Sequence, residues 1–183
     1  MRTAGKTKRR AAAGPARKSG PIQDLREWLA RVAELGELVR VAEPVDRDEE
    51  MSAIAYLVAK QQPSPAVLFE RARGFEKSPF GARLLWNILG PSLKRIALTL
   101  EEPPGTPAVE LIRRVKDKLK RRMPPRVVAR RAARVYEHTL TGAEINLDQL
   151  PIPRHWPLDG GRYAGTGDVV ITRDPDSGYL NLG

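Results

Sequence analysis

Two histidines, His138 and His155, are the only side chains in this sequence whose usual pKa lies near neutrality, which makes them the first candidates for acid–base chemistry. His155 lies in a proline-rich loop, and His138 alternates with apolar residues in a segment, residues 135–140, that predicts a strand. From these positions we interpret each as a structural or surface histidine. The sequence has no cysteine, so it offers no disulfide, thiolate nucleophile or cysteine-type zinc site.

The familiar catalytic motifs are missing from the sequence as well. It contains no H-E-x-x-H, Walker loop, G-x-S-x-G or Rossmann glycine pattern. The tripeptide Gly165-Thr166-Gly167 is too short for a phosphate loop, although its backbone amides could approach a phosphate closely. On residue type alone, Thr166 is a turn hydroxyl and Asn181 is a polar residue at the end of a strand.

Residues 150–183 have the composition of an extended segment followed by a β-hairpin. Three prolines within residues 151–157 cannot donate backbone hydrogen bonds or lie inside a helix, so the segment begins as extended chain. Residues 169–172 are all β-branched, residues 179–182 form a second short apolar run, and turn-forming residues separate the two. We therefore expect a hairpin at this end of the chain.

The order of motifs in this stretch resembles the UbiD-like family of decarboxylases, which use prenylated flavin mononucleotide (FMN). The matching pieces are LPIP at residues 150–153, W-P-x-D-G-G at 156–161, Thr166, VITRDP at 170–175 and N-L-G at 181–183. A second match lies in residues 24–46, where D-L-R-x-W-L is followed by G-E-L-V-R-V and E-P-V-D. Several spaced matches in a fixed order arise by chance far less often than one short motif. The resemblance extends over residues 22–183.

The resemblance implies an α/β (α+β) fold, with an N-terminal UbiD-like α/β domain followed by the opening hairpin of a flavin-binding split β-barrel. We expect a disordered basic tail over residues 1–20, the α/β domain over residues 21–150 and the start of the barrel domain over residues 151–183. The implied activity is that of a carboxy-lyase, the non-oxidative decarboxylation or carboxylation of aromatic or α,β-unsaturated carboxylic acids. The family also implies a homo-oligomer.

The resemblance gives roles to two residues. Asn181 takes the place of an asparagine that binds a divalent metal bridging to the flavin phosphate, and Thr166 matches a threonine that lies against the cofactor. An amide oxygen is a suitable ligand for Mn²⁺ or Mg²⁺, and K⁺ is a further expected cation. The family's catalytic arginine and glutamates, and the histidine and glutamate of its metal site, come after the matched portion. We therefore expect weak cofactor binding and no turnover from residues 1–183 alone.

The net charge of +10 suggests an alternative function, and the positions of the charged residues along the chain bear on it. Residues 1–20 carry +7 and residues 113–134 carry +10, which leaves −7 on the rest of the chain. The alternative is a noncatalytic basic protein whose two segments contact nucleic acid or an acidic partner. We favour solvated surfaces and no specific nucleic-acid partner, because the helical segment lacks the interleaved aromatic residues that bind single strands.

The elements that must position these residues follow from hydrophobic spacing. Apolar residues at three- and four-residue steps predict a helix at residues 25–35, with Asp24 as its N-cap, Gly36 at its end and Trp28 in the core. Further helices are predicted at residues 48–60, 93–100 and 108–122, and strands at 37–41, 67–69, 84–89, 135–140, 169–172 and 179–182. The alternation indicates an α/β domain. Lacking a long apolar run or a secretory-type N-terminus, the chain is expected to be cytoplasmic, with no membrane partner.

Overall fold

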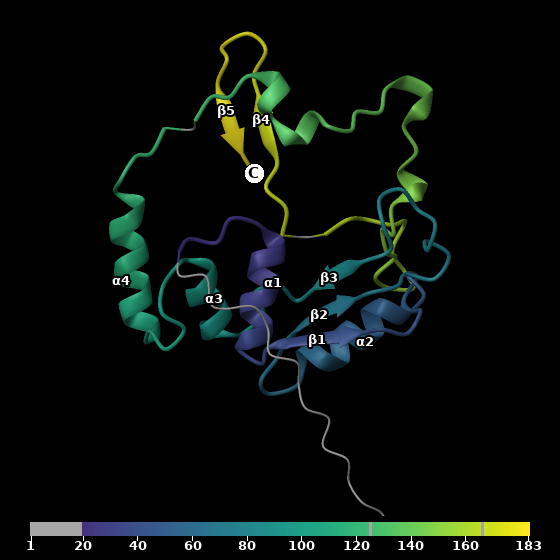
Figure 1. Ribbon diagram of the computed structural model, residues 1–183, viewed down its shortest axis with the longest axis horizontal. Coiled ribbons are helices and arrows are strands. Elements are labelled where there is room, and N and C mark those ends of the chain that lie inside the picture. Colours follow the sequence, from purple (N-terminus) through teal and green to yellow (C-terminus); the bar gives the residue numbers. More distant parts are fainter. Residues whose placement is uncertain (1–19, 125, 166) are drawn as a thin grey trace, which may run out of the picture.

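The computed structural model describes residues 20–124, 126–165 and 167–183 (Figure 1). The tail expected over residues 1–20 thus lies outside the described residues, except for Gly20. The helices are α1 (Leu25–Glu34), α2 (Glu50–Ala59), α3 (Leu93–Thr99) and α4 (Ala108–Leu119), and the strands are β1 (Leu38–Val41), β2 (Ala66–Phe69), β3 (Leu84–Trp86), β4 (Ile171–Arg173) and β5 (Leu180–Leu182). The mixed α and β architecture that the sequence predicts is confirmed.

A three-stranded sheet with the order β1-β2-β3 forms the centre of the domain. β1 and β2 run parallel, with Val39 beside Val67, whereas β2 and β3 run antiparallel, with Leu68 beside Leu85. β2 is the middle strand, and all four of its residues are buried. A middle strand that is covered on both faces is expected to be apolar throughout, as the A-V-L-F sequence of β2 is.

Alternate residues of β2 face two hydrophobic clusters on opposite sides of the sheet. Val67 and Phe69 pack with Met51 of α2, and Ala66 packs with Trp28 of α1 and Leu98 of α3. α2 therefore covers one face of the sheet, while α1 and α3 cover the other. Trp28 is 5% exposed and its Nε1 donates a hydrogen bond to Thr99 Oγ1 at 2.9 Å, which confirms its predicted place in the core.

Local signals define α1 as predicted. The Asp24 side chain accepts a hydrogen bond from the backbone N–H of Glu27 at 2.8 Å, which caps the helix. The Glu27 carboxylate accepts from the backbone N–H of Gln23 at 3.1 Å, one residue before the position expected in a capping box. Gly36 follows the helix with φ +71°, a left-handed conformation that glycine adopts at low cost.

The prediction of a strand at residues 135–140 is wrong. Residues 135 and 136 belong to a one-turn 3₁₀ helix, Arg134–Tyr136, which follows another at Arg130–Ala132, and Val135 is 81% exposed. A short apolar run becomes a strand only where another strand supplies hydrogen-bond partners, and the described residues place none beside it. His138 consequently lies in an exposed bend. The chain continues through two more 3₁₀ helices, Gly142–Glu144 and Leu147–Gln149.

β3 ends at Trp86, three residues before the predicted strand does. Asn87 adopts a left-handed φ of +53°, and its side-chain Nδ2 donates to the carbonyl of Pro65 at 2.7 Å and to Ser64 Oγ at 2.9 Å. These bonds hold the chain in a turn that leaves the strand ladder. Of the predicted strand residues 84–89, only Leu84–Trp86 pair with β2.

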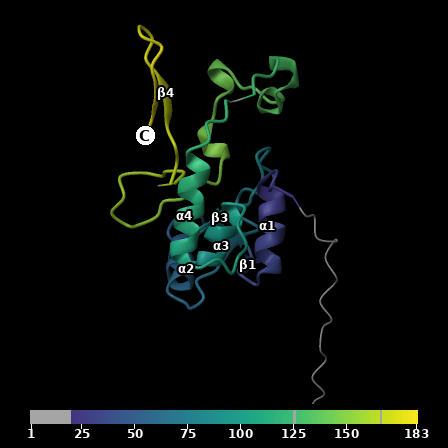
Figure 2. The same ribbon diagram turned by 90° about the vertical axis from the view of Figure 1, so that its left-hand side faces the viewer.

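β4 and β5 form a separate two-stranded sheet that stands apart from the central sheet in both views (Figures 1 and 2). This is the hairpin that the sequence predicts. The chain reaches it from α4 through the 3₁₀ turns and then through the proline-rich segment that precedes β4. None of the helices in the described part of the chain is long and apolar enough to cross a membrane.

Candidate cofactor site

The hairpin is built around Asp174. Its carboxylate accepts hydrogen bonds from the backbone N–H groups of Ser177 at 2.9 Å and Asp176 at 2.8 Å, and these bonds lower the pKa of Asp174. Gly178 completes the turn with φ +71°. The backbone of Asp174 donates to the carbonyl of Tyr179 at 2.9 Å, so the turn closes directly onto the strand ladder. The predicted turn chemistry is thus present.

Asn181 lies on an exposed face of this hairpin. It pairs with Thr172 in the antiparallel register of β4 and β5, so the two side chains share one face. Ile171, Leu180 and Leu182 occupy the opposite face and are 67%, 53% and 68% exposed. Both faces of the hairpin are therefore open, and the amide of Asn181 is accessible to a ligand.

Thr166, the other residue that the resemblance assigns to the cofactor, lies outside the described residues. Nearby, the Asp168 carboxylate lies close to Gly165, where an added Cβ would be 3.4 Å from Asp168 Oδ1. The structure thus brings Asn181 and Thr172 together, and gives no position for Thr166.

The segment that leads to the hairpin is attached to the α/β domain by ion pairs. Arg162 donates from Nε and Nη2 to the two carboxylate oxygens of Asp48, at 2.9 and 2.5 Å, and Arg154 donates to Glu49 at 2.5 Å. The backbone N–H of Glu49 also donates to the carbonyl of Arg154 at 2.9 Å. We call residues 150–163 the linker, and these contacts fix it against the loop before α2. Asp48 and Glu49 consequently precede α2, although the sequence predicts that the helix starts at residue 48.

The charges of the Asp48–Arg162 pair stabilise each other. The hydrogen bond from Arg162 lowers the pKa of the Asp48 carboxyl, and the same contact raises the pKa of Arg162. Sequence reasoning missed both residues as site-forming groups. The available signal was their position, because Asp48 follows the matched E-P-V-D motif and Arg162 comes directly after the matched W-P-x-D-G-G motif.

His155 takes part in an aromatic cluster on the linker. Its ring stacks on that of Tyr163, with centroids 4.0 Å apart, and lies 4.7 Å from the ring of Trp86 at the end of β3. Its Nε2 is 3.1 Å from the carbonyl oxygen of Tyr163. This packing fits the interpretation of His155 as a structural residue, since the ring is held between the linker and the central sheet.

The described residues do not by themselves complete a metal or flavin site. Asn181 offers one exposed amide oxygen, and the described part of the chain contains no group of three or more histidine, cysteine, aspartate or glutamate side chains arranged to hold a metal ion. A hard divalent cation takes six or more oxygen ligands, so one exposed amide is a poor site alone. Any such site needs ligands beyond those described here.

Two family models match the sequence. Residues 29–115 match the model described as the 3-octaprenyl-4-hydroxybenzoate carboxy-lyase N-terminal domain (UbiD_N), and residues 126–183 match the Rift-related domain of the same carboxy-lyase (UbiD). The two matches together cover well over half of the chain and follow the order that the motifs predict.

Two relatives are much longer than this chain. An uncharacterized protein from Aquifex aeolicus is 35% identical over 181 residues, which cover 88% of this chain and 35% of the relative. An uncharacterized protein from Archaeoglobus fulgidus is 31% identical over 173 residues, which cover 88% of this chain and 34% of the relative. The chain spans about a third of the length of the curated relatives that it matches.

Solved structures extend the match to three dimensions. Vanillic acid decarboxylase from Sedimentibacter hydroxybenzoicus in its open form has a TM-score of 0.76 and 31% identity, over 90% of this chain and 35% of that one. An evolved dimeric form of HmfF, a UbiD-class enzyme from Pelotomaculum thermopropionicum in complex with prFMN, has a TM-score of 0.69 and 29% identity, over 86% of this chain and 34% of that one. Motifs, domain models and fold agree, and the chain belongs to the UbiD-like family of carboxy-lyases.

Proposed function

We propose that residues 1–183 contribute the N-terminal α/β domain and the first barrel hairpin of a UbiD-like enzyme. The enzyme uses prenylated FMN and decarboxylates or carboxylates aromatic or α,β-unsaturated carboxylic acids. The observation that carries the proposal is the ordered match to both domain models, together with a hairpin that presents Asn181 on an open face. The complex of HmfF with prFMN and the name of the vanillic acid decarboxylase support the cofactor and the substrate class.

The proposed role of the chain follows from its two described parts. In this proposal residues 21–150 form the first domain and residues 151–183 begin the second, with Asp48 and Arg162 fixing the path between them. Asn181 contributes one ligand to a divalent cation, Mn²⁺ or Mg²⁺, and Thr166 contacts the cofactor. The remaining metal ligands and the acid–base groups come from polypeptide that corresponds to the other two thirds of the relatives.

The exposed hairpin supports the need for that polypeptide. Ile171, Leu180 and Leu182 form an apolar face, and the outer edges of β4 and β5 carry backbone groups that no described strand pairs. A sheet of two short strands is marginal by itself and gains stability when further strands cover it. Completion of a barrel would supply that cover. A homo-oligomer, as the family implies, would form from the completed protein.

Reconstitution tests the proposal. We would co-express this chain with a flavin prenyltransferase, alone and together with a second polypeptide that carries the remaining two thirds of the Aquifex aeolicus relative. The readouts are the absorption spectrum of the purified protein and CO₂ release from a panel of aromatic and α,β-unsaturated acids. The chain alone should release no CO₂, and the co-purified pair should hold flavin and decarboxylate at least one acid. A folded, co-purified pair that holds no flavin would contradict the proposal.

A further inference from the structure

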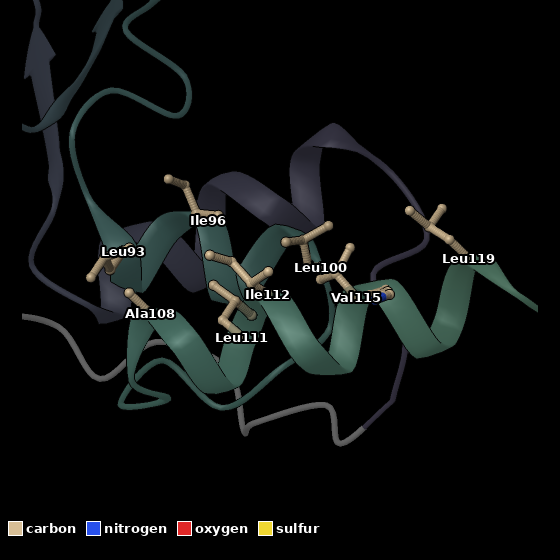
Figure 3. A pocket seen from close by; sticks show the side chains of 9 residues that line it. Leu93, Ile96, Leu100, Ala108, Leu111, Ile112, Val115 and Leu119 are labelled. Carbon is tan, nitrogen blue, oxygen red and sulfur yellow. The ribbon is translucent and has the colours of Figure 1, made fainter.

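An apolar groove runs between α3 and α4. Its volume is about 520 Å³, and Figure 3 shows side chains from both helices lining it. Its lining includes Leu93 and Ile96 from α3 and Ile112, Val115, Lys116 and Leu119 from α4. Lys116 is the one charged residue in the lining, and it lies among aliphatic neighbours.

Within the described part of the chain, no element covers the apolar side chains of the groove. Leu93 is 49% exposed, Ile112 is 67% exposed and Leu119 is 79% exposed, whereas Leu111 beneath them is buried. Single exposed apolar residues are ordinary, but a contiguous apolar groove of this kind marks a surface that binds a partner. A concave groove between two helices is suited to receive the apolar side chains of a third helix.

The charged side chains beside the groove indicate which charge a partner should carry. Arg113, Lys116 and Lys120 recur at three- and four-residue steps and so lie along one side of α4. Lys120 pairs with Asp117 at 2.7 Å, while Glu102 pairs with Arg114 and Lys118 on the helix. Among the described residues, no carboxylate forms an ion pair with Arg113 or Lys116. The groove therefore has an apolar floor and a cationic side.

Three other occupants fit this surface less well. A second copy of the chain would bring two basic α4 helices together, and residues 1–20, with a charge of +7, have the same sign as the groove. An anionic membrane matches the charge but meets a protein through flat or protruding apolar surface, whereas this surface is hollow. An acidic helix satisfies the charge, the apolar floor and the shape together.

We propose that the α3–α4 groove is a docking site for an amphipathic, acidic α-helix of a partner protein. Leucine-like side chains at three- and four-residue steps fill the groove beside Ile112 and Leu119, and glutamates or aspartates flanking them pair with Lys116 and Arg113. The inference does not rest on the proposed flavin chemistry, since it concerns a different face of the domain. Its test requires no cofactor and no turnover.

A set of synthetic peptides tests the proposal on the whole chain. The probe is a labelled, helix-forming peptide about four turns long with leucines at helical spacing and flanking glutamates. One control peptide has lysines in place of the glutamates, and another has the acidic composition in scrambled order. Fluorescence anisotropy should show binding of the acidic peptide, with both controls weaker by at least about tenfold. Amide exchange should then fall in α3 and α4.

Variants of the chain separate the groove from general charge attraction. Ile112→Glu should abolish binding of the acidic peptide, and Lys116→Glu should weaken it by about tenfold and favour the lysine peptide instead. Leu57→Glu is the matched control, because Leu57 is 65% exposed on α2, away from the groove lining. Lys77→Glu makes the same charge change as Lys116→Glu in an exposed loop. Both controls should bind like the unchanged chain.

Three outcomes would overturn the proposal. The first is that the acidic and lysine peptides bind equally well, or that no peptide binds. The second is binding to phosphatidylserine vesicles that Ile112→Glu removes, without peptide binding, which would assign the groove to a membrane surface. The third is concentration-dependent dimerisation that Ile112→Glu removes, which would assign it to a second copy.

Discussion

Arg162 contacts Asp48 through two hydrogen bonds across 114 residues of sequence. The pair is reinforced by Arg154, which contacts Glu49 through its side chain and its backbone carbonyl. The linker that carries Arg154 and Arg162 leads straight into β4. The direction in which the hairpin leaves the domain is therefore set by contacts with the loop before α2, rather than by the hairpin itself.

Replacement of Asp48 by Asn should release the linker. An amide cannot accept two charge-assisted hydrogen bonds from a guanidinium, so the linker loses its strongest attachment. Hydrogen exchange measured by mass spectrometry should become faster in residues 151–163 and remain unchanged in β2. Glu43→Gln is the matched control, because Glu43 is exposed and lies near Asp48 in sequence. Unchanged exchange in the linker of the Asp48→Asn variant would contradict this role.

The same pair should respond to acid. The pKa of Asp48 in the folded protein lies below its ordinary value of 3.8, because Arg162 stabilises the carboxylate. The stabilisation is therefore fully present above the unfolded pKa and is lost as the pH falls through the folded pKa. A carbon-13 NMR titration of the Asp48 carboxyl group should give a midpoint below 3.8 in the unchanged chain. In an Arg162→Gln variant the midpoint should move upward, and a midpoint that does not move would show that another group lowers the pKa.

A buried ion pair between Arg95 and Glu37 should matter far more to stability. Arg95 is fully buried, and its Nη1 donates to Glu37 Oε2 at 2.9 Å, while its Nε donates to the carbonyl of Ile88 at 3.0 Å. Glu37→Ala would leave a buried guanidinium without its counterion, which costs about 3–5 kcal/mol. Urea unfolding measures this loss.

A surface pair beside strands β1 and β2 gives the control. Arg40 and Glu70 also form an ion pair, but the Arg40 side chain is half exposed. Arg40→Ala should therefore cost less than about 1 kcal/mol. A double variant with methionine at both position 37 and position 95 should recover much of the stability lost by Glu37→Ala, because no charge remains buried. Similar losses for Glu37→Ala and Arg40→Ala would argue against a buried, coupled pair.

The parts of the fold that the sequence predicts correctly are those with local causes. The cap and end of α1 depend on Asp24 and Gly36, and the turn of the hairpin depends on Asp174 and Gly178, all of which act on neighbours close in sequence. Residues 135–140 have the composition of a strand, but none of the described strands lies beside them. Their conformation depends on partners that composition does not reveal.

The candidate site was predictable only in part, because it too depends on contacts between residues far apart in sequence. Asn181 and Thr166 were named through the resemblance to a family, since their residue types alone indicate no chemistry. The contacts that position the hairpin join Asp48 to Arg162 and Glu49 to Arg154 over more than a hundred residues. Such pairs can be found from a single sequence only by chance, because every exposed acid and base is an equally good candidate.

DNA binding by the basic segments should be weak and nonspecific. Arg130 lies over the ring of Tyr136 at 4.1 Å, and the pocket of about 450 Å³ beside it is lined by exposed arginines of one short segment, residues 130–137, which suit phosphate contacts. Phosphate contacts carry no sequence information. Affinity should fall linearly with the logarithm of salt concentration, by about 0.9 log unit per phosphate contact on duplex DNA. Deletion of residues 1–20 should reduce the slope, and random and defined duplexes should bind equally in a salt titration. Sequence-dependent binding that survives this deletion would favour the alternative function of a nucleic-acid-binding protein.

Asn181 offers the sharpest test of the candidate site, because its side chain is exposed and its loss should not destabilise the chain. Asn181→Ala should leave the thermal midpoint of the chain unchanged and, in the reconstituted pair, reduce retained metal and flavin by more than about tenfold. Asn181→Asp keeps an oxygen ligand and should retain most of the metal. Thr172→Ala, on the same face and paired with Asn181, is the control and should retain both. Metal analysis and flavin absorbance, together with the thermal midpoint, separate these outcomes from a folding defect. Equal losses of metal and flavin in Asn181→Ala and Thr172→Ala would show that the hairpin face acts as a contact surface and that Asn181 is not a metal ligand.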